Sequence, residues 1–197
     1  RSLNGGIAVT NEIKNYELKY YPEYRCSVIS NGINLQKNKL AKIKSLKKGG
    51  KVNYVFLVSS LNSWQGINRL IKSLSQNSKS INIHIAGNLH PHDLGNLKQF
   101  DCVTYHGYLN REQMNELLNL CHIGIGTLEL YTKDMNEACP LKVRDYLSFG
   151  LPIVIGYKDT DIMQQPELQK YTYQLQNDSS IIEIKKNLLI SPIVFIM

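Results

Sequence analysis

The feature that most constrains the fold is a repeated alternation between short apolar runs and longer amphipathic stretches. The runs are rich in β-branched and aromatic residues, and the stretches carry apolar residues at a spacing near 3.6. The runs lie at residues 7–10, 26–30, 54–58, 81–86, 103–106, 123–127, 153–156 and 173–175, and the amphipathic stretches at about 11–20, 66–77, 92–99, 110–121, 140–149 and 178–189. This pattern predicts an α/β fold with a Rossmann-like parallel sheet and helices on both faces.

The alternation is interrupted between Asn31 and Lys51. An Asn-Gly dipeptide typical of tight turns begins this stretch, and the lysine-rich segment behind it has only a thin apolar stripe. The two strands in front of it are too few to form a domain, so we expect them to be the end of another one. The expected parts are residues 1–35 as that remnant, residues 36–51 as a lysine-rich linker and residues 52–197 as one Rossmann-like domain.

The net charge of the chain comes from the linker alone. The 197 residues carry 23 basic and 16 acidic side chains, and seven of the lysines fall between Lys37 and Lys51, so the remainder has 16 of each. A nucleic-acid-binding face would spread its basic residues among aromatics, so we expect no nucleic-acid partner. The linker is either a solvated connection or a peripheral contact with an anionic membrane, at ~1 kcal/mol per lysine.

The cysteine and histidine patterns argue against a metal site. The four cysteines are widely spaced and no two form a C-x-x-C pair, which indicates free thiols in a reducing, cytoplasmic compartment. His90-x-His92 has no further ligand cluster at metal spacing, and we interpret it as part of a surface turn. No signal peptide is recognisable, and no apolar run approaches the length of a membrane span.

The first candidate loop for ligand binding follows the strand at 54–58. Ligands of doubly wound sheets bind at the carboxyl ends of the strands, so the loops there are the places to examine. Ser60, Gln65 and Gly66 belong to a stretch of small and polar residues before a helix. Such a loop holds a phosphate with its backbone N–H groups, or else it only forms a turn and an N-cap. The chain has no G-x-x-x-x-G-K-[ST] sequence, so an ATP-binding P-loop is excluded.

The second candidate site lies at the start of the helix at 140–149. Pro140 suits the first helical position, which leaves the N–H groups of Leu141 and Lys142 at the helix mouth beside a positive charge. Asp145 would lie about 5–7 Å further along the helix, a suitable span from a diphosphate to a ribose diol. Glu137, in front of the helix, would hold another sugar in the same way. The alternative is an exposed loop acid and a Lys142–Asp145 pair on a solvated face.

Five motifs together resemble a known family. The segment from Glu137 to Val154 contains E-x7-D-Y-L-S-x-G-x-P-I-V, which is similar to the E-x7-E signature of the group-1 retaining glycosyltransferases of the GT-B fold, in their P-L-K variant. The other four are I-S-N-G-I-N at 29–34, F-L-V with Q-G-I at 56–67, I-H-I-A-G at 83–87 and V-T-Y-H-G-Y-L at 103–109. The resemblance extends from residue 7 to about residue 185.

The resemblance implies the C-terminal, donor-binding half of a hexosyltransferase-type enzyme (EC 2.4). Its donor would be a nucleotide-diphosphate sugar, with no cofactor and no metal. Glu137 would hold the hydroxyls of the donor sugar and Asp145 the ribose, while Leu141 and Lys142 would receive the diphosphate. Glu137 and Lys142 are therefore the expected catalytic residues, and cationic and amide groups would stabilise the leaving diphosphate.

Other donor-binding positions follow from the same resemblance. The backbone around Tyr105, Gly107 and Tyr108 would frame the base. In the first loop the family often has an arginine and a lysine, where this chain has Ser60 and Gln65. Fewer cations would then stabilise the leaving group, and we expect slower catalysis.

Two functions remain open on this basis. The first is transfer of a sugar, with retention, to a saccharide or lipid-linked acceptor in cell-surface glycan biosynthesis at the cytoplasmic face of the membrane. The second is a non-catalytic nucleotide-sugar-binding module that needs a separate acceptor-binding chain. In either case residues 1–35 would be the remnant of the N-terminal acceptor domain, and we expect the chain to be truncated and incomplete for catalysis. A flavodoxin-like regulatory domain and a sugar-nucleotide epimerase fit the motifs less well.

Overall fold

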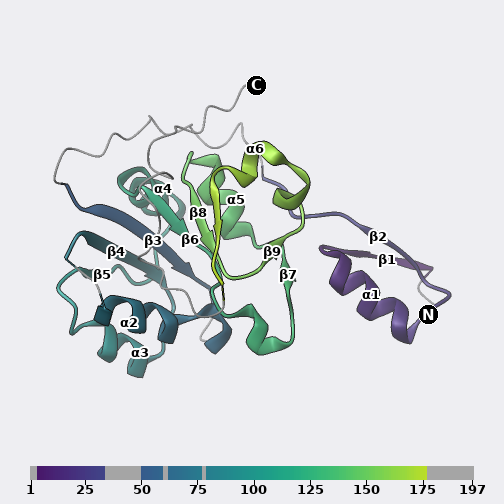
Figure 1. Ribbon diagram of the computed structural model, residues 1–197, viewed down its shortest axis with the longest axis horizontal. Coiled ribbons are helices and arrows are strands. Elements are labelled where there is room, and N and C mark those ends of the chain that lie inside the picture. Colours follow the sequence, from purple (N-terminus) through teal and green to yellow (C-terminus); the bar gives the residue numbers. More distant parts are fainter. Residues whose placement is uncertain (1–3, 34–49, 60–61, 77–78, 177–197) are drawn as a thin grey trace.

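The computed structural model describes residues 4–33, 50–59, 62–76 and 79–176 (Figure 1). The elements, with η for a 3-10 turn, are β1 (Gly5–Ala8), α1 (Asn11–Tyr20), β2 (Arg25–Val28), β3 (Val52–Val58), η2 (Ser63–Gln65), α2 (Ile67–Gln76), β4 (Ile81–Gly87), α3 (Pro91–Leu97), β5 (Val103–Tyr105), α4 (Arg111–Leu120), β6 (Ile123–Ile125), η3 (Leu130–Lys133), β7 (Glu137–Ala138), α5 (Leu141–Ser148), β8 (Ile153–Ile155), β9 (Lys158–Asp159), η4 (Ile162–Gln164), α6 (Pro166–Gln169) and β10 (Thr172–Gln174). The predicted linker lies largely, and the predicted helix at 178–189 wholly, outside the described residues.

Six parallel strands form the main sheet, in the order β10-β8-β6-β3-β4-β5. The strand order reverses at β3, because the chain adds β4 and β5 on one side and then β6, β8 and β10 on the other. β1 and β2 pair in parallel as a separate two-stranded sheet, with α1 as their connection (Figure 1). The predicted Rossmann-like α/β architecture is confirmed, and so are all eight predicted strands.

Helices cover both faces of the main sheet, as predicted. α2 and α3 pack on one face, and α4 and α5 on the other (Figure 1). Successive residues of β3 alternate between the two cores: Phe56 packs with the helices of the first face and Val55 with those of the second. Every helix that the sequence predicts within the described ranges is present, and each boundary lies within two residues of its expected position.

Tyr146 of α5 links the two central strands β3 and β6 through hydrogen bonds. Its buried hydroxyl accepts from the Leu57 N–H (2.8 Å) and donates to the Ile125 carbonyl (3.1 Å), which joins the ends of β3 and β6. Gly124 makes room for the ring, since a Cβ there would lie 2.4 Å from it. The carboxyl ends of β3 and β6 are therefore held rigidly at the place where the strand order reverses.

Two features differ from the expectations. The two-residue strands β7 and β9 pair in parallel beside the main sheet, and the sequence does not predict them because two residues show no periodicity. α5 begins at Leu141, with Pro140 as its N-cap instead of its first residue. Within the described ranges no helix is long and apolar enough to cross a membrane.

Candidate functional site

A cavity of about 670 Å³ opens at the carboxyl ends of β3 and β4, beside Thr127, two residues after β6. This is the point where the strand order reverses, at which doubly wound sheets bind ligands. The described residues that line it are Asn31, Leu57, Val58, Ser59, Trp64, Gln65, Ala86, Gly87, Tyr108, Leu109, Asn110, Arg111, Met114, Thr127, Pro140, Leu141 and Lys142. Among them Arg111 and Lys142 are cationic and none is acidic, so the lining favours an anionic ligand.

Lys142 is the basic residue in the first turn of α5. Its Nζ donates to the Leu57 carbonyl (3.1 Å) and to Gln65 Oε1 (2.7 Å), and lies 4.9 Å from the centroid of the Phe56 ring. These neighbours are uncharged, and burial lowers the pKa of the ammonium group to about 7. An anion in the cavity would favour the protonated form, so Lys142 is placed to take up a proton when a phosphate group binds.

Four of the residues expected from the sequence share this cavity. Gln65 is 2% exposed and orients Lys142 through its side-chain oxygen. Leu141 begins α5, and Pro140 provides no side-chain cap for the first-turn N–H groups of this helix. Pro140, Leu141 and Lys142 all line the cavity, so this helix start belongs to its wall. Tyr108 stands at the rim with 90% of its surface exposed. The helix mouth, its lysine and the loop after β5 are thus brought together as expected.

Three other expected residues, Gly66, Tyr105 and Gly107, do not line the cavity. Ser60 lies outside the described residues. Gly66 has a left-handed backbone (φ 88°) and leaves no room for a Cβ against the loop after β6. The Tyr105 hydroxyl donates to the Gly87 carbonyl (2.8 Å), and the Gly107 carbonyl accepts from the Gly87 N–H (2.7 Å). These contacts hold the loops that form the wall, so these residues shape the cavity from behind.

Asp145 is engaged by a residue that the sequence analysis did not identify. Its Oδ1 accepts from Arg111 Nη1 at 3.0 Å, which joins α5 to the first residue of α4. Arg111 lines the cavity and Asp145 does not. In the sequence, Arg111 is marked only by its position directly after the N-cap Asn110, which places it at the start of a helix.

Glu137 lies on β7, outside the lining of the cavity. Its Oε2 accepts from the Glu12 N–H (2.9 Å) in the first turn of α1. In return, Glu12 Oε2 accepts from the backbone N–H groups of Asn136 (2.9 Å) and Glu137 (2.8 Å). The carboxylate expected at the donor sugar is therefore bound to the N-terminal helix.

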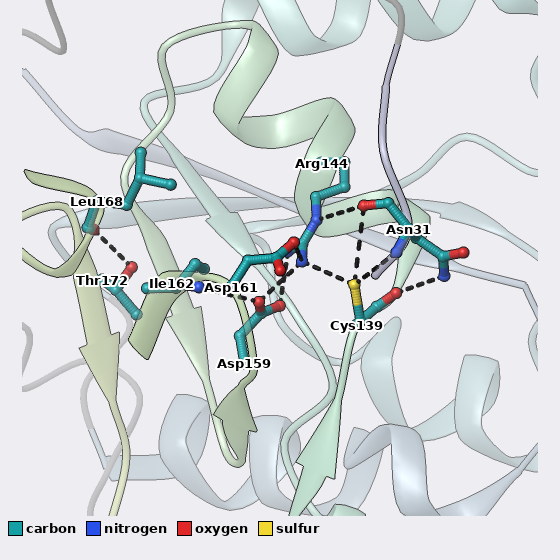
Figure 2. Close-up of polar contacts among 8 residues, drawn as sticks. All are labelled: Asn31, Cys139, Arg144, Asp159, Asp161, Ile162, Leu168 and Thr172. Carbon is teal, nitrogen blue, oxygen red and sulfur yellow. Dashed lines mark hydrogen bonds and ion pairs between the residues drawn. The ribbon is translucent and has the colours of Figure 1, made fainter. Parts of the chain in front are cut away.

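The N-terminal unit, residues 4–33 with β1, α1 and β2, contacts the segment of Glu137 at a second point. Asn31 donates from Nδ2 to the Cys139 carbonyl (2.6 Å) and from its backbone N–H to Cys139 Sγ (3.1 Å), while its carbonyl accepts from Arg144 Nε (3.0 Å). Figure 2 shows Arg144 between Asn31 on one side and two aspartates on the other, Asp159 at the end of β9 and Asp161 just after it. Asn31, which follows β2, is thus fixed to the segment that carries Glu137.

Arg144 also explains the metal-like cluster of this region. Within the described ranges, Cys139, Asp159 and Asp161 are the one group of ligand atoms close enough to hold a metal ion, all within 4.8 Å of one another. The Arg144 guanidinium binds both oxygens of the nearly inaccessible Asp159 (2.7 and 2.9 Å), and also Asp161 (2.9 Å) and Cys139 Sγ (2.7 Å) (Figure 2). This cation already pairs with both carboxylates, so these side chains form an ion-pair network.

Comparisons with known proteins agree with this architecture. A family model described as glycosyl transferases group 1 matches residues 38–160. No curated protein sequence matches the chain. Among solved structures, WaaG, a glycosyltransferase of lipopolysaccharide biosynthesis, superposes with a TM-score of 0.63 at 14% identity, over 88% of this chain and 50% of that one. The lipopolysaccharide outer core galactosyltransferase WaaB gives 0.61 at 13% identity, over 87% and 48%.

A third similar structure is Anabaena Alr3699/HepE in complex with UDP-glucose, with a TM-score of 0.63 and 14% identity over 91% of this chain and 52% of that one. At such identities the superpositions establish the fold, and the chain spans about half the length of these structures. The family match covers more than half of the chain, and it includes five of the six strands of the main sheet and all described lining residues of the cavity except Asn31. The chain belongs to the group 1 glycosyl transferases.

Proposed function

We propose that the chain is the donor-binding part of a retaining glycosyltransferase, which transfers a hexosyl group from a nucleotide-diphosphate sugar to a saccharide or lipid-linked acceptor. The observation that carries this is the charge of the cavity lining. The described lining residues include Arg111 and Lys142 but no aspartate or glutamate, and they lie beside the N-terminus of α5, which has no side-chain cap. A diphosphate is the ligand that such a lining favours. HepE, of similar fold, was solved with UDP-glucose, and this supports a nucleotide sugar as the donor.

Lys142 is the residue best placed to assist the leaving group. Breaking the sugar–phosphate bond leaves negative charge on the diphosphate, and preorganised cations and N–H groups stabilise that charge. Gln65 and the Leu57 carbonyl hold the Lys142 ammonium group in place beforehand. We assign the amide of Leu141 to the same phosphate groups, and the exposed ring of Tyr108 to the nucleoside end of the cavity.

One observation favours the second function, a nucleotide-sugar-binding module without turnover. Glu137, the expected ligand of the donor sugar, has its carboxylate bound to the Glu12 N–H. In an active enzyme the donor hydroxyls must replace or share this contact. A non-catalytic module would keep it, bind the nucleotide and depend on a separate acceptor-binding chain.

Calorimetry and donor hydrolysis distinguish these functions. The full chain is titrated with UDP, GDP and ADP, beside Lys142→Met and the control Lys170→Met, whose lysine pairs with Glu167 on the surface. We expect one diphosphate to bind and Lys142→Met alone to weaken it at least tenfold. Binding of none would refute both functions. Hydrolysis of the matching sugar nucleotide that disappears in Glu137→Ala supports the enzyme, and binding without hydrolysis supports the module.

The acceptor side of the proposal rests on the sequence. A polysaccharide or lipid-linked acceptor at the cytoplasmic membrane face would agree with a lysine-rich segment that attracts anionic lipids. Sedimentation with vesicles of phosphatidylcholine and phosphatidylserine checks this directly. We expect salt-sensitive binding that charge reversal of Lys42, Lys44, Lys47 and Lys48 abolishes, and unchanged binding would refute the membrane contact.

A further inference from the structure

We propose that Arg111, oriented by Asp145, is the residue that recognises the ribose of the nucleotide donor. This inference deepens the proposed function and rests on it. The resemblance alone assigns the ribose to the carboxylate of Asp145. In the structure Arg111 reaches the cavity, and Asp145 stands behind it.

The start of α4 fixes the position of the Arg111 backbone. Asn110 Oδ1 accepts from the Gln113 N–H (2.9 Å), and Gln113 Oε1 accepts from the Asn110 N–H (3.0 Å), which completes a capping box. Arg111 is the first residue of the helix that this box anchors. Its backbone is therefore held at the cavity wall, and only the side chain needs orienting.

Asp145 supplies that orientation. Its side chain is 16% exposed, against 50% for Arg111, and the ion pair between them measures 3.0 Å. The carboxylate is thus the more buried partner, and Arg111, which contributes to the cavity lining, is the more exposed one. An arginine fork held at one edge by a carboxylate keeps further N–H donors in a fixed plane.

The order of groups along α5 places the ribose near this pair. The N-terminus of α5 and Lys142 form the phosphate end of the cavity. Asp145 follows Lys142 by three residues, about 4.5 Å along the helix axis. A ribose joined to the phosphates would therefore meet the Arg111–Asp145 pair, and the base would lie beyond it toward Tyr108.

The chemistry of this pair matches a ribose better than a short carboxylate does. Aspartate is one methylene shorter than the glutamate of the family signature, so its oxygens stay further from the ligand. The long arginine side chain spans that gap, and its N–H groups donate to the oxygens of the 2′- and 3′-hydroxyls. A nucleotide without the 2′-hydroxyl removes one acceptor of these hydrogen bonds, so the site discriminates against deoxyribose.

The test compares ribose with deoxyribose in the full chain. UDP, GDP and ADP are each titrated beside their 2′-deoxy forms, with the variants Arg111→Ala, Arg111→Lys and Asp145→Asn and the control Lys170→Ala. We expect the wild type to prefer the ribonucleotide by about tenfold, a smaller ratio than for a fully buried site because Arg111 is half exposed. Arg111→Ala brings the ratio close to one, mainly by weakening the ribonucleotide, and Arg111→Lys does the same because lysine lacks the fork.

The double variant shows whether Asp145 acts through Arg111. If it does, Asp145→Asn lowers the same ratio of affinities. The double variant Arg111→Ala with Asp145→Asn then has the same ratio as Arg111→Ala alone. Two results would overturn the inference: a ratio that Arg111→Ala leaves unchanged, or equal weakening of ribonucleotide and deoxyribonucleotide, which places Arg111 at the phosphates. If the wild type binds no diphosphate at all, the proposed function itself fails, so the two failures are distinguishable.

Discussion

Glu12 and Glu137 bind each other through reciprocal hydrogen bonds although they lie 125 residues apart. Each carboxylate accepts from the backbone N–H of the other residue, at 2.8 and 2.9 Å. Glu137 also lies at the positive N-terminal end of α1, which stabilises its charge. The N-terminal unit is thereby attached to the segment that carries the expected donor-sugar ligand.

Removal of the Glu12 side chain should loosen this attachment. In Glu12→Ala the N–H groups of Asn136 and Glu137 lose a charged acceptor, which costs about 1–2 kcal/mol for partly exposed groups. We expect amide hydrogens of α1 to exchange about 5–30-fold faster, measured by hydrogen–deuterium exchange. The control is Glu23→Ala, at the far end of the same unit. Equal exchange in the two variants would contradict the contact.

Nucleotide binding should weaken as the pH rises through about 7. Burial lowers the pKa of Lys142 to about 7, so its charge, present below that value, disappears as the pH rises through it. A bound diphosphate raises the pKa again, and binding near neutral pH should take up a proton. Calorimetry of UDP binding in two buffers of different ionisation enthalpy measures this uptake. Lys142→Arg stays charged and should show no uptake at this site, so the same uptake in that variant would assign it to another group.

Loss of Arg144 should destabilise the protein strongly. Its ion pair with Asp159 has side chains that are only 8% and 0% exposed, so Arg144→Leu leaves a buried charge without a partner. We expect a loss of about 3–5 kcal/mol in the free energy of unfolding, measured by urea denaturation. The exposed pair of Lys170 and Glu167 provides the matched control, and Lys170→Leu should leave the free energy of unfolding almost unchanged. Arg144→Leu combined with Asp159→Leu should recover part of the loss; similar effects of Arg144→Leu and Lys170→Leu would refute the prediction.

The histidine pair His84–His106 should make the fold sensitive to acid. The ring nitrogens lie 3.1 Å apart, and burial lowers both pKa values, that of His84 further through the charge of His106. The folded state therefore favours neutral rings. The stability from this pair is present above the unfolded pKa of 6.5 and is lost as the pH falls through the lowered folded values.

His106→Gln tests this pair against the exposed control His92→Gln. Urea denaturation between about pH 7.5 and pH 5 should show a smaller loss of stability in His106→Gln than in the wild type or the control. A loss that is the same in all three proteins would show that other groups cause the acid sensitivity.

Much of the site was predictable because it depends on local geometry. Parallel strands end at one edge of a sheet, so the loop with Gln65, the loop with Tyr108 and the start of α5 had to meet there. Leu141 and Lys142 follow Pro140 directly, and a helix that begins at this place turns its first N–H groups toward that edge. These residues line the cavity for reasons that lie within a few positions of each in the chain.

The partners of the charged side chains were not predictable in the same way. Asp145 and Arg111 are 34 residues apart, and Arg144 meets Asn31 across 113 residues. No periodicity or motif connects such positions, and a long side chain has several rotamers that the sequence does not distinguish. The resemblance therefore assigned Asp145 to a ligand and did not identify the arginine that binds it.

The sequence by itself determined eight of the strands of this protein, the helices α1 to α5 and the edge of the sheet where the cavity opens. These features follow from apolar periodicity and from the common direction of parallel strands. Only the tertiary structure decided that Glu137 binds Glu12, that Arg111 lines the cavity and pairs with Asp145, and that Arg144 pairs with two aspartates. Electrostatic contacts depend on distances of a few ångströms between remote segments, and those distances exist only once the chain is folded.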